Sequence, residues 1–360
     1  MSQVYLNCRF LTQRITGVQR FAVEICRQLD CLINDYPQLE LIGLLPRQAI
    51  LAQYGQQTFK HIKLYQVGNL TGHLWEQLEL PYFSRGKLLI NLCNAAPLIK
   101  RQQIITIHDI IFTTNYDSQK WWFRSWYYLM SKINLHQARV VFTVSEFSRQ
   151  AIAKWSKRNL ADIIVLGNAP SLANYKYADE ILTQLNLTSG NYFLLIGSNS
   201  RRKNTQMVAK LFASSDKLVN FNLVIVGGQY SNLKHVTPII APNIIYTDYI
   251  TDCQLRSLYR SSRGLIFPSL YEGFGIPLLE AMAEQTPVLV SDIPICHEVC
   301  ATAALYFNPK QSQELEQQLL NLLNQPDLAN QLVANANLRL ANYHWQSYAK
   351  LILEQLIQFS

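Results

Sequence analysis

Short apolar runs alternate with helical segments along the chain, and this alternation restricts the fold more than any other feature of the sequence. The runs are nearly continuously apolar, as strands buried on both faces are. They are Val4–Phe10, Leu39–Leu45, His61–Val67, Leu88–Cys93, Ile104–Ile107, Val140–Val144, Tyr192–Ile196, Leu223–Val226, Ile244–Tyr246, Leu265–Phe267, Val288–Val290 and Leu305–Phe307. Helical segments such as Val18–Leu29 separate them. The alternation predicts an α/β protein with parallel sheets and right-handed crossovers.

The length of the chain predicts two such sheets. A single core rarely grows beyond about 250–300 residues, and this chain has 360. A polar stretch, Ala169–Gly190, separates the two blocks of alternation. We therefore expect two Rossmann-like domains, 1–170 and 171–342, and a further amphipathic helix in 343–360.

Composition excludes several classes of protein. The chain is 49% hydrophobic and 16% charged, which excludes a disordered or fibrous protein. No apolar run approaches about 18 residues, so no membrane-spanning helix is expected, and residues 1–7 lack the features of a signal peptide. The seven cysteines are scattered without a CxxC pair, which predicts reduced thiols in a cytoplasmic protein.

The net positive charge lies in the first half of the chain. Residues 1–180 hold 20 Lys and Arg against 12 Asp and Glu, which accounts for the whole net charge of +8. A basic half favours an anionic partner, namely membrane headgroups, nucleic acid or a phosphorylated substrate. The alternative is a basic surface that only faces solvent.

Two carboxylates flank a glycine-containing turn in Ser269–Glu280. This segment follows an apolar run and begins a helical one, and Glu272 and Glu280 stand eight residues apart. A helix N-terminus at this place offers free backbone N–H groups to an anion. The N–H groups expected to do so belong to Phe274, Gly275 and Ile276. Glu280 is placed to accept hydrogen bonds from sugar hydroxyls, and Glu272 to lie nearer the reacting end. The alternative is a strand–helix turn with a capping glutamate.

Three cations cluster in Gly197–Asn204, between an apolar run and a helical segment. They are Arg201, Arg202 and Lys203. Cations at such a turn suit the diphosphate of a nucleotide sugar, whose charge must be neutralised as the sugar leaves. A solvated basic turn is the alternative.

The sequence resembles a known family from about Thr16 to Gln355. Ser269–Glu280 resembles the E-x7-E signature of retaining glycosyltransferases of the GT-B fold, family 4, which belong to the group 1 glycosyltransferases. Four further segments resemble this family in the same order, namely Thr16–Arg20, Ile107–Asp109, Val144–Ser148 and Gly197–Asn204. Two positions depart from its pattern: Gln285 stands where glycine is usual, and Ser198 where arginine is frequent.

The resemblance implies two Rossmann-like domains that face a cleft, with residues 343–360 returning to the first domain. It implies transfer of a hexosyl group from a nucleoside diphosphate sugar, held by the second domain, to a hydroxyl acceptor, with retention of configuration. The residues matched to the donor site are Gly17, Ser198, Arg201, Arg202, Lys203, Phe274, Gly275, Ile276 and Glu280. Lys203, with Arg201 or Arg202, would stabilise the phosphates and Glu280 the ribose. Glu272 and His108 would hold the sugar, so that His108, Lys203 and Glu272 are the candidate catalytic residues.

Motifs that are absent narrow the chemistry further. No Asp-x-Asp and no convincing zinc spacing occurs, so no metal site and no cofactor are expected. No dinucleotide fingerprint follows the first run, and no RNA-reading signature occurs, so no nucleic acid is expected as a partner. The motifs are most similar to mannosyltransferases of bacterial polysaccharide assembly, for which GDP-mannose is the expected donor. A non-catalytic relative that only binds sugar nucleotides is the alternative.

An aromatic segment, Trp121–Tyr128, lies in the basic half and is followed by Lys132. Such a segment suits the surface of a membrane, and it also suits a helix whose rings fill a core. The first interpretation predicts a peripheral protein at the inner face of the membrane, acting on a lipid-linked acceptor.

Overall fold

The computed structural model describes residues 2–47, 59–116, 121–197, 200–227 and 237–359. The chain divides into two compact units. Unit 1 comprises Met1–Thr113, Gln119–Asn168 and His344–Ser360, and unit 2 comprises Thr114–Ser118 and Ala169–Tyr343. The main boundary thus falls at 168/169, where the sequence analysis placed it at 170/171. Each unit is an α/β fold with a parallel sheet, as the alternation predicted.

Unit 1 contains a seven-stranded sheet of order β3-β2-β1-β4-β5-β6-β7, and its strand pairs are parallel. The strands are β1 (Ser2–Asn7), β2 (Leu39–Pro46), β3 (Lys63–Val67), β4 (Leu88–Asn91), β5 (Gln103–Thr106), β6 (Val140–Thr143) and β7 (Ile163–Val165). The first six correspond to predicted runs. Strand β7, which has three residues, was not predicted.

The helices of unit 1 include the predicted ones and one that was missed. They are α1 (Gly17–Leu32), α4 (Trp121–Gln137), α5 (Glu146–Ser156), α13 (Trp345–Ile357) and a helical stretch composed of α2 (Gly72–Leu74), a π-helical turn (Trp75–Glu79) and α3 (Leu80–Phe83). Ser145 caps α5, and its hydroxyl accepts a hydrogen bond from the Ser148 N–H at 3.0 Å. The stretch 72–83 was not predicted.

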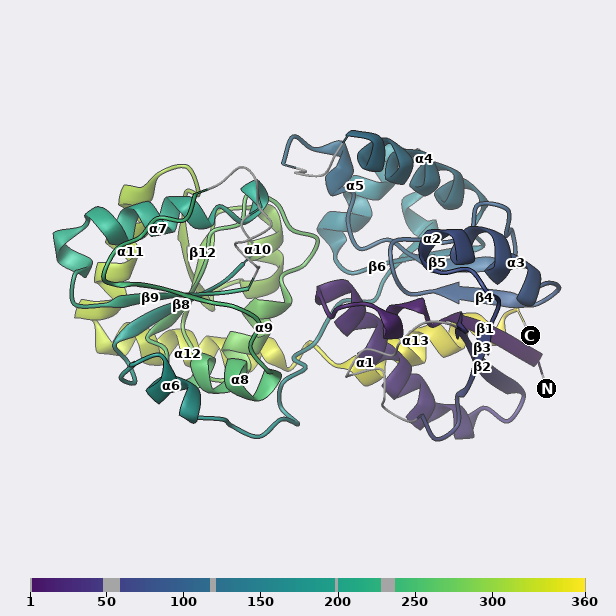
Figure 1. Cartoon of the computed structure of the whole chain (residues 1–360), viewed down its shortest axis with the longest axis horizontal. Coiled ribbons are helices and arrows are strands. Elements are labelled where there is room, and N and C mark those ends of the chain that lie inside the picture. The colour runs from purple at the N-terminus through teal and green to yellow at the C-terminus, as the bar shows by residue number, and fades with distance from the viewer. Residues whose placement is uncertain (1, 48–58, 117–120, 198–199, 228–236, 360) are drawn as a thin grey trace. The chain divides into compact units, whose positions relative to one another are not determined.

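Helix α13 packs against α1 within unit 1, although nearly the whole of unit 2 separates the two helices in the sequence (Figure 1). The rings of Trp345 and Phe21 meet with their centroids 5.9 Å apart. On α13, Ile352 and Leu356 are fully buried. The C-terminal helix therefore returns to the first unit, as the resemblance implied.

Unit 2 contains a six-stranded sheet of order β10-β9-β8-β11-β12-β13, again parallel. The strands are β8 (Tyr192–Ile196), β9 (Asn222–Val226), β10 (Ile244–Thr247), β11 (Gly264–Phe267), β12 (Val288–Ser291) and β13 (Ala304–Phe307). The helices are α6 (Glu180–Gln184), α7 (Thr205–Ser214), α8 (Asp252–Ser261), α9 (Ile276–Ala283), α10 (Pro294–Cys300), α11 (Ser312–Asn324) and α12 (Pro326–Leu340). Figure 1 shows α7 and α11 on one side of β8 and β9, with α8 and α9 on the other.

Each sheet has one place where the strand order reverses. In unit 1, β2 and β3 follow β1 on one side of it, whereas β4 lies on its other side and β5, β6 and β7 continue from there. The reversal therefore lies between β1 and β4. In unit 2 it lies between β8 and β11. Open α/β sheets bind their ligands outside the carboxyl ends of the strands at this switch point. The segments that follow these four strands are thus where a site is expected.

No helix among the described residues combines the length and the hydropathy that crossing a bilayer requires.

Candidate active site

The basic turn of unit 2 follows β8 at the switch point. After Gly197, residues 200–204 lead into α7, with a 3-10 turn at Arg201–Lys203 and a left-handed Asn204 at φ 51°. Ser198, which was matched to the donor site, lies outside the described residues. A Cβ atom at Gly197 would lie 3.1 Å from the Thr205 side chain and 3.5 Å from Lys203 Cβ. The turn is therefore packed tightly against the start of α7.

Glu272 brings the turn together with the loop that follows β11. Its Oε1 lies 2.8 Å from Lys203 Nζ, and its Oε2 pairs with the Arg202 guanidinium. The backbones are joined as well, because the Leu270 N–H donates to the Arg202 carbonyl at 2.8 Å. Arg201 is exposed to solvent. Of the two arginines that the sequence analysis left open, Arg202 is the one that faces Glu272.

The charges of this cluster determine its protonation. Burial alone would raise the pKa of Glu272, but the charges of Lys203 and Arg202 lower it to about 2. Burial lowers the pKa of Lys203, and the charge of Glu272 opposes that shift. The Lys203 ammonium also lies over the Phe267 ring, 5.1 Å from its centroid. An ionised carboxylate thus holds two cations in a largely buried position, where charge interactions are stronger than in water.

The loop from β11 to α9 ends in a glycine that the backbone requires. Gly275 has φ 110°, and a Cβ atom there would lie 3.0 Å from Leu278 Cδ1. Helix α9 begins directly afterwards at Ile276, whose backbone N–H has no partner within the helix. Pro277 carries no N–H, and the Leu278 N–H donates to the Gly275 carbonyl at 3.0 Å. Phe274 is buried and packs edge-on against the Tyr343 ring, with centroids 5.8 Å apart. This packing fixes the loop beside the basic turn.

Glu280 lies on α9 and is held by two hydroxyl groups. Its Oε1 accepts a hydrogen bond from Ser171 Oγ at 3.0 Å, and its Oε2 accepts one from Tyr259 at 3.2 Å. The residue is 4% exposed. The sequence analysis missed both partners, since neither stands in a motif. The contact of Glu280 with a ribose stays a prediction.

In unit 1, His108 follows β5 and is buried. Its Nε2 lies 3.0 Å from the Leu92 carbonyl, and its backbone N–H donates to Asn94 Oδ1 at 2.7 Å. Burial lowers the pKa of His108 to about 4, although the bond to Leu92 opposes that shift. The ring is therefore neutral at pH 7, and the Leu92 carbonyl assigns the proton to Nε2. Asp109 accepts a hydrogen bond from the Ile111 N–H at 3.1 Å, so it orders the local backbone.

Gly17 is the first residue of α1, near His108. The helix opens with a capping box, in which the Thr16 side chain and backbone are paired with Gln19. One turn further on, the Phe21 ring meets the His108 ring edge-on, with centroids 4.8 Å apart. The structure thus brings the first turn of α1 and His108 to the same carboxyl edge of the sheet. Whether either residue contacts a donor stays a prediction.

The aromatic segment forms the first part of α4 and is divided between core and surface. Trp121 is 79% exposed, and Trp122 and Leu129 are more than half exposed. Tyr127, by contrast, is partly buried and packs against the core of unit 1. Neither a membrane-facing segment nor a core-filling helix therefore describes all of its rings.

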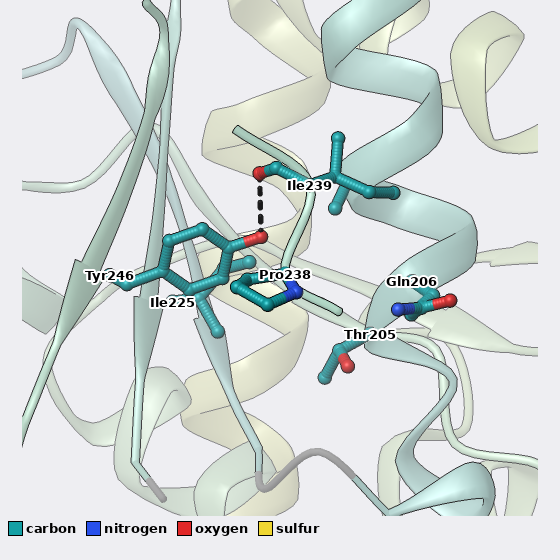
Figure 2. A pocket seen from close by; sticks show the side chains of 7 residues that line it. Thr205, Gln206, Ile225, Pro238, Ile239 and Tyr246 are labelled. Carbon is teal, nitrogen blue, oxygen red and sulfur yellow. Dashed lines mark hydrogen bonds between the residues drawn. The ribbon is translucent and has the colours of Figure 1, made fainter. Parts of the chain in front are cut away.

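Neither of two small cavities is lined by Lys203, Glu272, Glu280 or His108. The first has a volume of about 10 Å³ between α7, β9 and β10, and the Tyr246 hydroxyl donates to the Ile239 carbonyl at its edge (Figure 2). It has room for about one water molecule. The second, about 200 Å³, is lined by Ser2, Val4 and Leu88 near the amino ends of β1 and β4, opposite the edge that carries His108. In the part of the chain that the structure describes, no three His, Cys, Asp or Glu side chains are grouped to hold a metal ion.

Comparison with known proteins agrees with this geometry. Residues 178–339 match the family described as "Glycosyl transferases group 1". The chain is 30% identical over 280 residues to the O-antigen chain mannosyltransferase RfbU of Salmonella typhimurium. The aligned region covers 75% of this chain and 73% of the relative.

Solved structures share the fold at low identity. Sucrose-phosphate synthase from Thermosynechococcus elongatus is 17% identical with a TM-score of 0.76, and all of both chains is covered. HepE of Anabaena, solved in complex with UDP and glucose, is 15% identical with a TM-score of 0.76 over 99% of each chain.

Proposed function

Because the chain belongs to the group 1 glycosyltransferases, we propose that it transfers a mannosyl group from a nucleoside diphosphate sugar to a hydroxyl acceptor during the assembly of a cell-surface polysaccharide. The observation that carries this proposal is the cluster of Arg202, Lys203 and Glu272 at the switch point of unit 2. A non-catalytic relative is not favoured, since this cluster has the charges that the chemistry needs.

The two cations act on the leaving group. As the bond between the sugar and the diphosphate breaks, negative charge develops on the phosphate oxygens. Lys203 and Arg202 are held in place by Glu272 and by the backbone of the β11–α9 loop, so they need little reorganisation to stabilise that charge. The Ile276 N–H at the start of α9 adds a donor for the same anion.

We assign Glu272 and Glu280 to different parts of the donor. Glu272 precedes α9 and lies beside the phosphate cations, so we assign it to the sugar hydroxyls. Glu280 lies inside α9, where Ser171 and Tyr259 orient its carboxylate, and we assign it to the ribose. His108 is assigned to the sugar from unit 1; its neutral ring, with the proton on Nε2, leaves Nδ1 as a hydrogen-bond acceptor.

Retention of configuration and independence from metal belong to the same proposal. The acceptor hydroxyl would attack from the face that the diphosphate leaves, through an oxocarbenium-like state. The C1–oxygen bond to the acceptor forms as the C1–oxygen bond to phosphate breaks, and the leaving phosphate takes the hydroxyl proton. Fixed cations then replace the divalent metal that other glycosyltransferases use, and no cofactor is required.

GDP-mannose is the donor that we propose. The support is the relative RfbU, whose name states that it is a mannosyltransferase of O-antigen chains. HepE was solved with UDP, so the fold also accepts a uridine nucleotide, and the choice of base depends on side chains outside the motifs.

The acceptor is proposed to be lipid-linked and to be met at the inner face of the membrane. The exposed rings of Trp121 and Trp122 begin α4, in the half of the chain that carries the net charge of +8. Aromatic rings and cations together favour the interface of an anionic bilayer. Peripheral binding would bring unit 1 to such an acceptor.

A thermal-shift and turnover panel with UDP, GDP, ADP and TDP sugars tests the proposal. A ligand at 100 times its dissociation constant stabilises the folded state by about 2.7 kcal/mol. We expect GDP-mannose to raise the melting temperature most and to be turned over. Binding without turnover of any donor would favour the non-catalytic alternative, and greater stabilisation and turnover with another sugar nucleotide would replace GDP-mannose.

A further inference from the structure

A buried polar cluster occupies the switch point of the unit 1 sheet. None of its residues belongs to a motif that the sequence analysis described. Asn7 ends β1 and Asn91 ends β4, and the Asn7 side-chain amide donates to Asn91 Oδ1 at 3.0 Å. These two strands are the neighbours between which the strand order reverses. The cluster therefore lies at the edge of unit 1 where a ligand is expected.

Glu76 is the centre of this cluster. Its Oε1 accepts from Asn7 Nδ2 at 2.9 Å and from Arg9 Nε at 3.3 Å, and its Oε2 accepts from Arg9 Nη2 at 3.2 Å. The residue is 2% exposed. Burial alone would raise the pKa of Glu76, but His73, Arg9 and Asn7 lower it, so the carboxylate is ionised. A buried carboxylate with this many donors is firmly fixed.

The helix that carries Glu76 is irregular at this point. Trp75–Glu79 forms a π-helical turn between α2 and α3. Such turns are rare and occur frequently at functional sites. The Trp75 ring, fully buried, donates to the Val67 carbonyl at 2.9 Å and anchors the turn. The irregular turn thus directs Glu76 toward the ends of β1 and β4 and leaves His73 one turn earlier.

His73 connects the buried cluster to the surface. Its Nδ1 lies 3.1 Å from Glu76 Oε2, and its side chain is 36% exposed. The Tyr127 ring meets the imidazole edge-on, with centroids 6.1 Å apart, and limits its rotation. A carboxylate at Nδ1 fixes the proton there and leaves Nε2 as a hydrogen-bond acceptor. The outward nitrogen is therefore prepared to receive an O–H group.

We propose that His73 Nε2 binds and orients the hydroxyl of the sugar acceptor, and that Glu76 is the positioning residue that holds the imidazole for this task. The inference rests on the proposed glycosyl transfer and adds to it the residue that selects the acceptor. His73 accepts a hydrogen bond from the hydroxyl and keeps no proton, since the leaving phosphate takes it. Water that replaces the acceptor is held in the same way.

Two amide substitutions at His73 separate this role from a structural one. The side-chain amide of Gln places an acceptor oxygen near the position of the imidazole Nε2, whereas that of Asn reaches only the position of Nδ1. His73→Gln should therefore keep the acceptor contact, and His73→Asn should keep only a contact with Glu76. His136→Gln is the matched control, because His136 is an exposed histidine on α4.

Two rates are measured with the full-length chain and the donor that the thermal-shift and turnover panel identifies. They are the rate of transfer to methyl α-mannoside and the rate of donor hydrolysis, in which water is the acceptor. We expect His73→Asn to lower the rate of donor hydrolysis by at least tenfold. If the wild type transfers to methyl α-mannoside, kcat/KM for that acceptor should fall by at least tenfold as well. His73→Gln should restore most of the loss, and His136→Gln should equal wild type. Melting temperatures are measured for every variant.

Three other outcomes decide against the inference or against its premise. If His73→Asn and His73→Gln both turn over like wild type, the assignment of His73 is wrong. If Asn restores activity and Gln does not, His73 acts only by holding Glu76. If the wild-type chain turns over no donor at all, the proposed function fails, and the failure is not specific to His73.

Discussion

Glu272 Oε1 lies 2.8 Å from Lys203 Nζ, and the second oxygen of the same carboxylate pairs with Arg202. The two cations that we assign to the diphosphate are thus already paired with one carboxylate of the protein, which leaves the cluster one net positive charge. A donor must compete with Glu272 for both of them. We expect donor binding to loosen these ion pairs and to free the carboxylate for the sugar hydroxyls.

Lys203→Ala should reduce turnover by roughly ten- to a thousandfold, the scale of losing one group that stabilises transition-state charge. Arg202 would still pair with Glu272, so the protein should fold. Lys210→Ala is the control, because Lys210 is exposed on α7 a few residues further on. Steady-state kinetics measure both variants, and a folded Lys203→Ala protein with normal turnover would contradict the assignment.

The two glutamates should respond differently to the same substitution. Glu280→Gln should weaken binding of the bare nucleotide by about tenfold or more, since it removes a charged acceptor of hydrogen bonds. Glu272→Gln should mainly lower turnover, because we assign Glu272 to the sugar, where bonds change. Isothermal calorimetry with GDP and steady-state kinetics give the two measurements.

Ser171→Ala serves as the control for Glu280→Gln. It removes the hydroxyl that donates to Glu280 Oε1 but leaves the carboxylate in place. If Ser171→Ala loses as much nucleotide affinity as Glu280→Gln, the effect is one of burial and not of a ribose contact. If Glu272→Gln loses affinity while Glu280→Gln keeps it, the two roles are reversed.

His108 should make the stability of the protein depend on pH. Its pKa is lowered by burial from 6.5 to about 4, so the unfolded chain binds the proton more readily than the folded one. Stability is therefore unaffected above pH 6.5 and falls as the pH decreases from 6.5 to 4. Between pH 8 and pH 5 the loss amounts to about 2 kcal/mol.

Urea unfolding of the wild type and of His108→Gln at pH 8 and pH 5 measures this dependence. The variant should lose about 2 kcal/mol less than the wild type over the same interval. An equal loss in both proteins would show that His108 is protonated as readily in the folded state as in the unfolded chain.

Removal of divalent metal should leave most of the activity in place. The fixed cations Lys203 and Arg202 stabilise the phosphate charge in the proposed reaction. Turnover is measured before and after treatment with EDTA. A complete loss that Mn²⁺ or Mg²⁺ restores would contradict this account of the phosphate chemistry.

The chain should bind vesicles that contain anionic lipid, and salt should weaken this binding because exposed charges are screened. Replacement of the exposed rings, Trp121→Ala with Trp122→Ala, should reduce it severalfold. Leu338→Ala is the control, because Leu338 is 75% exposed but lies on α12 in unit 2. Vesicle sedimentation at low and high salt measures binding, and equal sedimentation of all variants would exclude α4 as the contact.

The sequence predicted all strands except β7, and the turns of the candidate donor site, because these depend on local patterns. The apolar runs are short and regular, and the cations and glutamates stand in contiguous segments. It could not predict that Glu272 pairs with Lys203, since this contact exists only because β8 and β11 are neighbours in the sheet. Ser171 was missed for the same reason, as its partner Glu280 lies far along the chain.

Three helices escaped prediction, namely the stretch 72–83, α10 and α12. In the first and the last of these, the apolar residues do not form a regular buried face. In the stretch 72–83, Leu74, Leu78 and Tyr82 recur four apart but are all exposed, and Pro81 interrupts the pattern of a helix. In α12, only Leu332 and Ala336 are buried. Glu76 lies on the first of these helices, so no pattern in the sequence predicted its contact with Asn7 of β1.

The return of α13 to α1 has a consequence for synthesis on the ribosome. Unit 1 cannot cover Phe21 and its neighbours until residues after 344 have emerged, whereas the main part of unit 2 is contiguous and complete before then. At about 5–20 residues per second, the chain between α1 and α13 takes roughly fifteen to sixty seconds to make. During that interval the nascent protein presents an uncovered apolar face on α1, which makes it a client for chaperones that hold such surfaces.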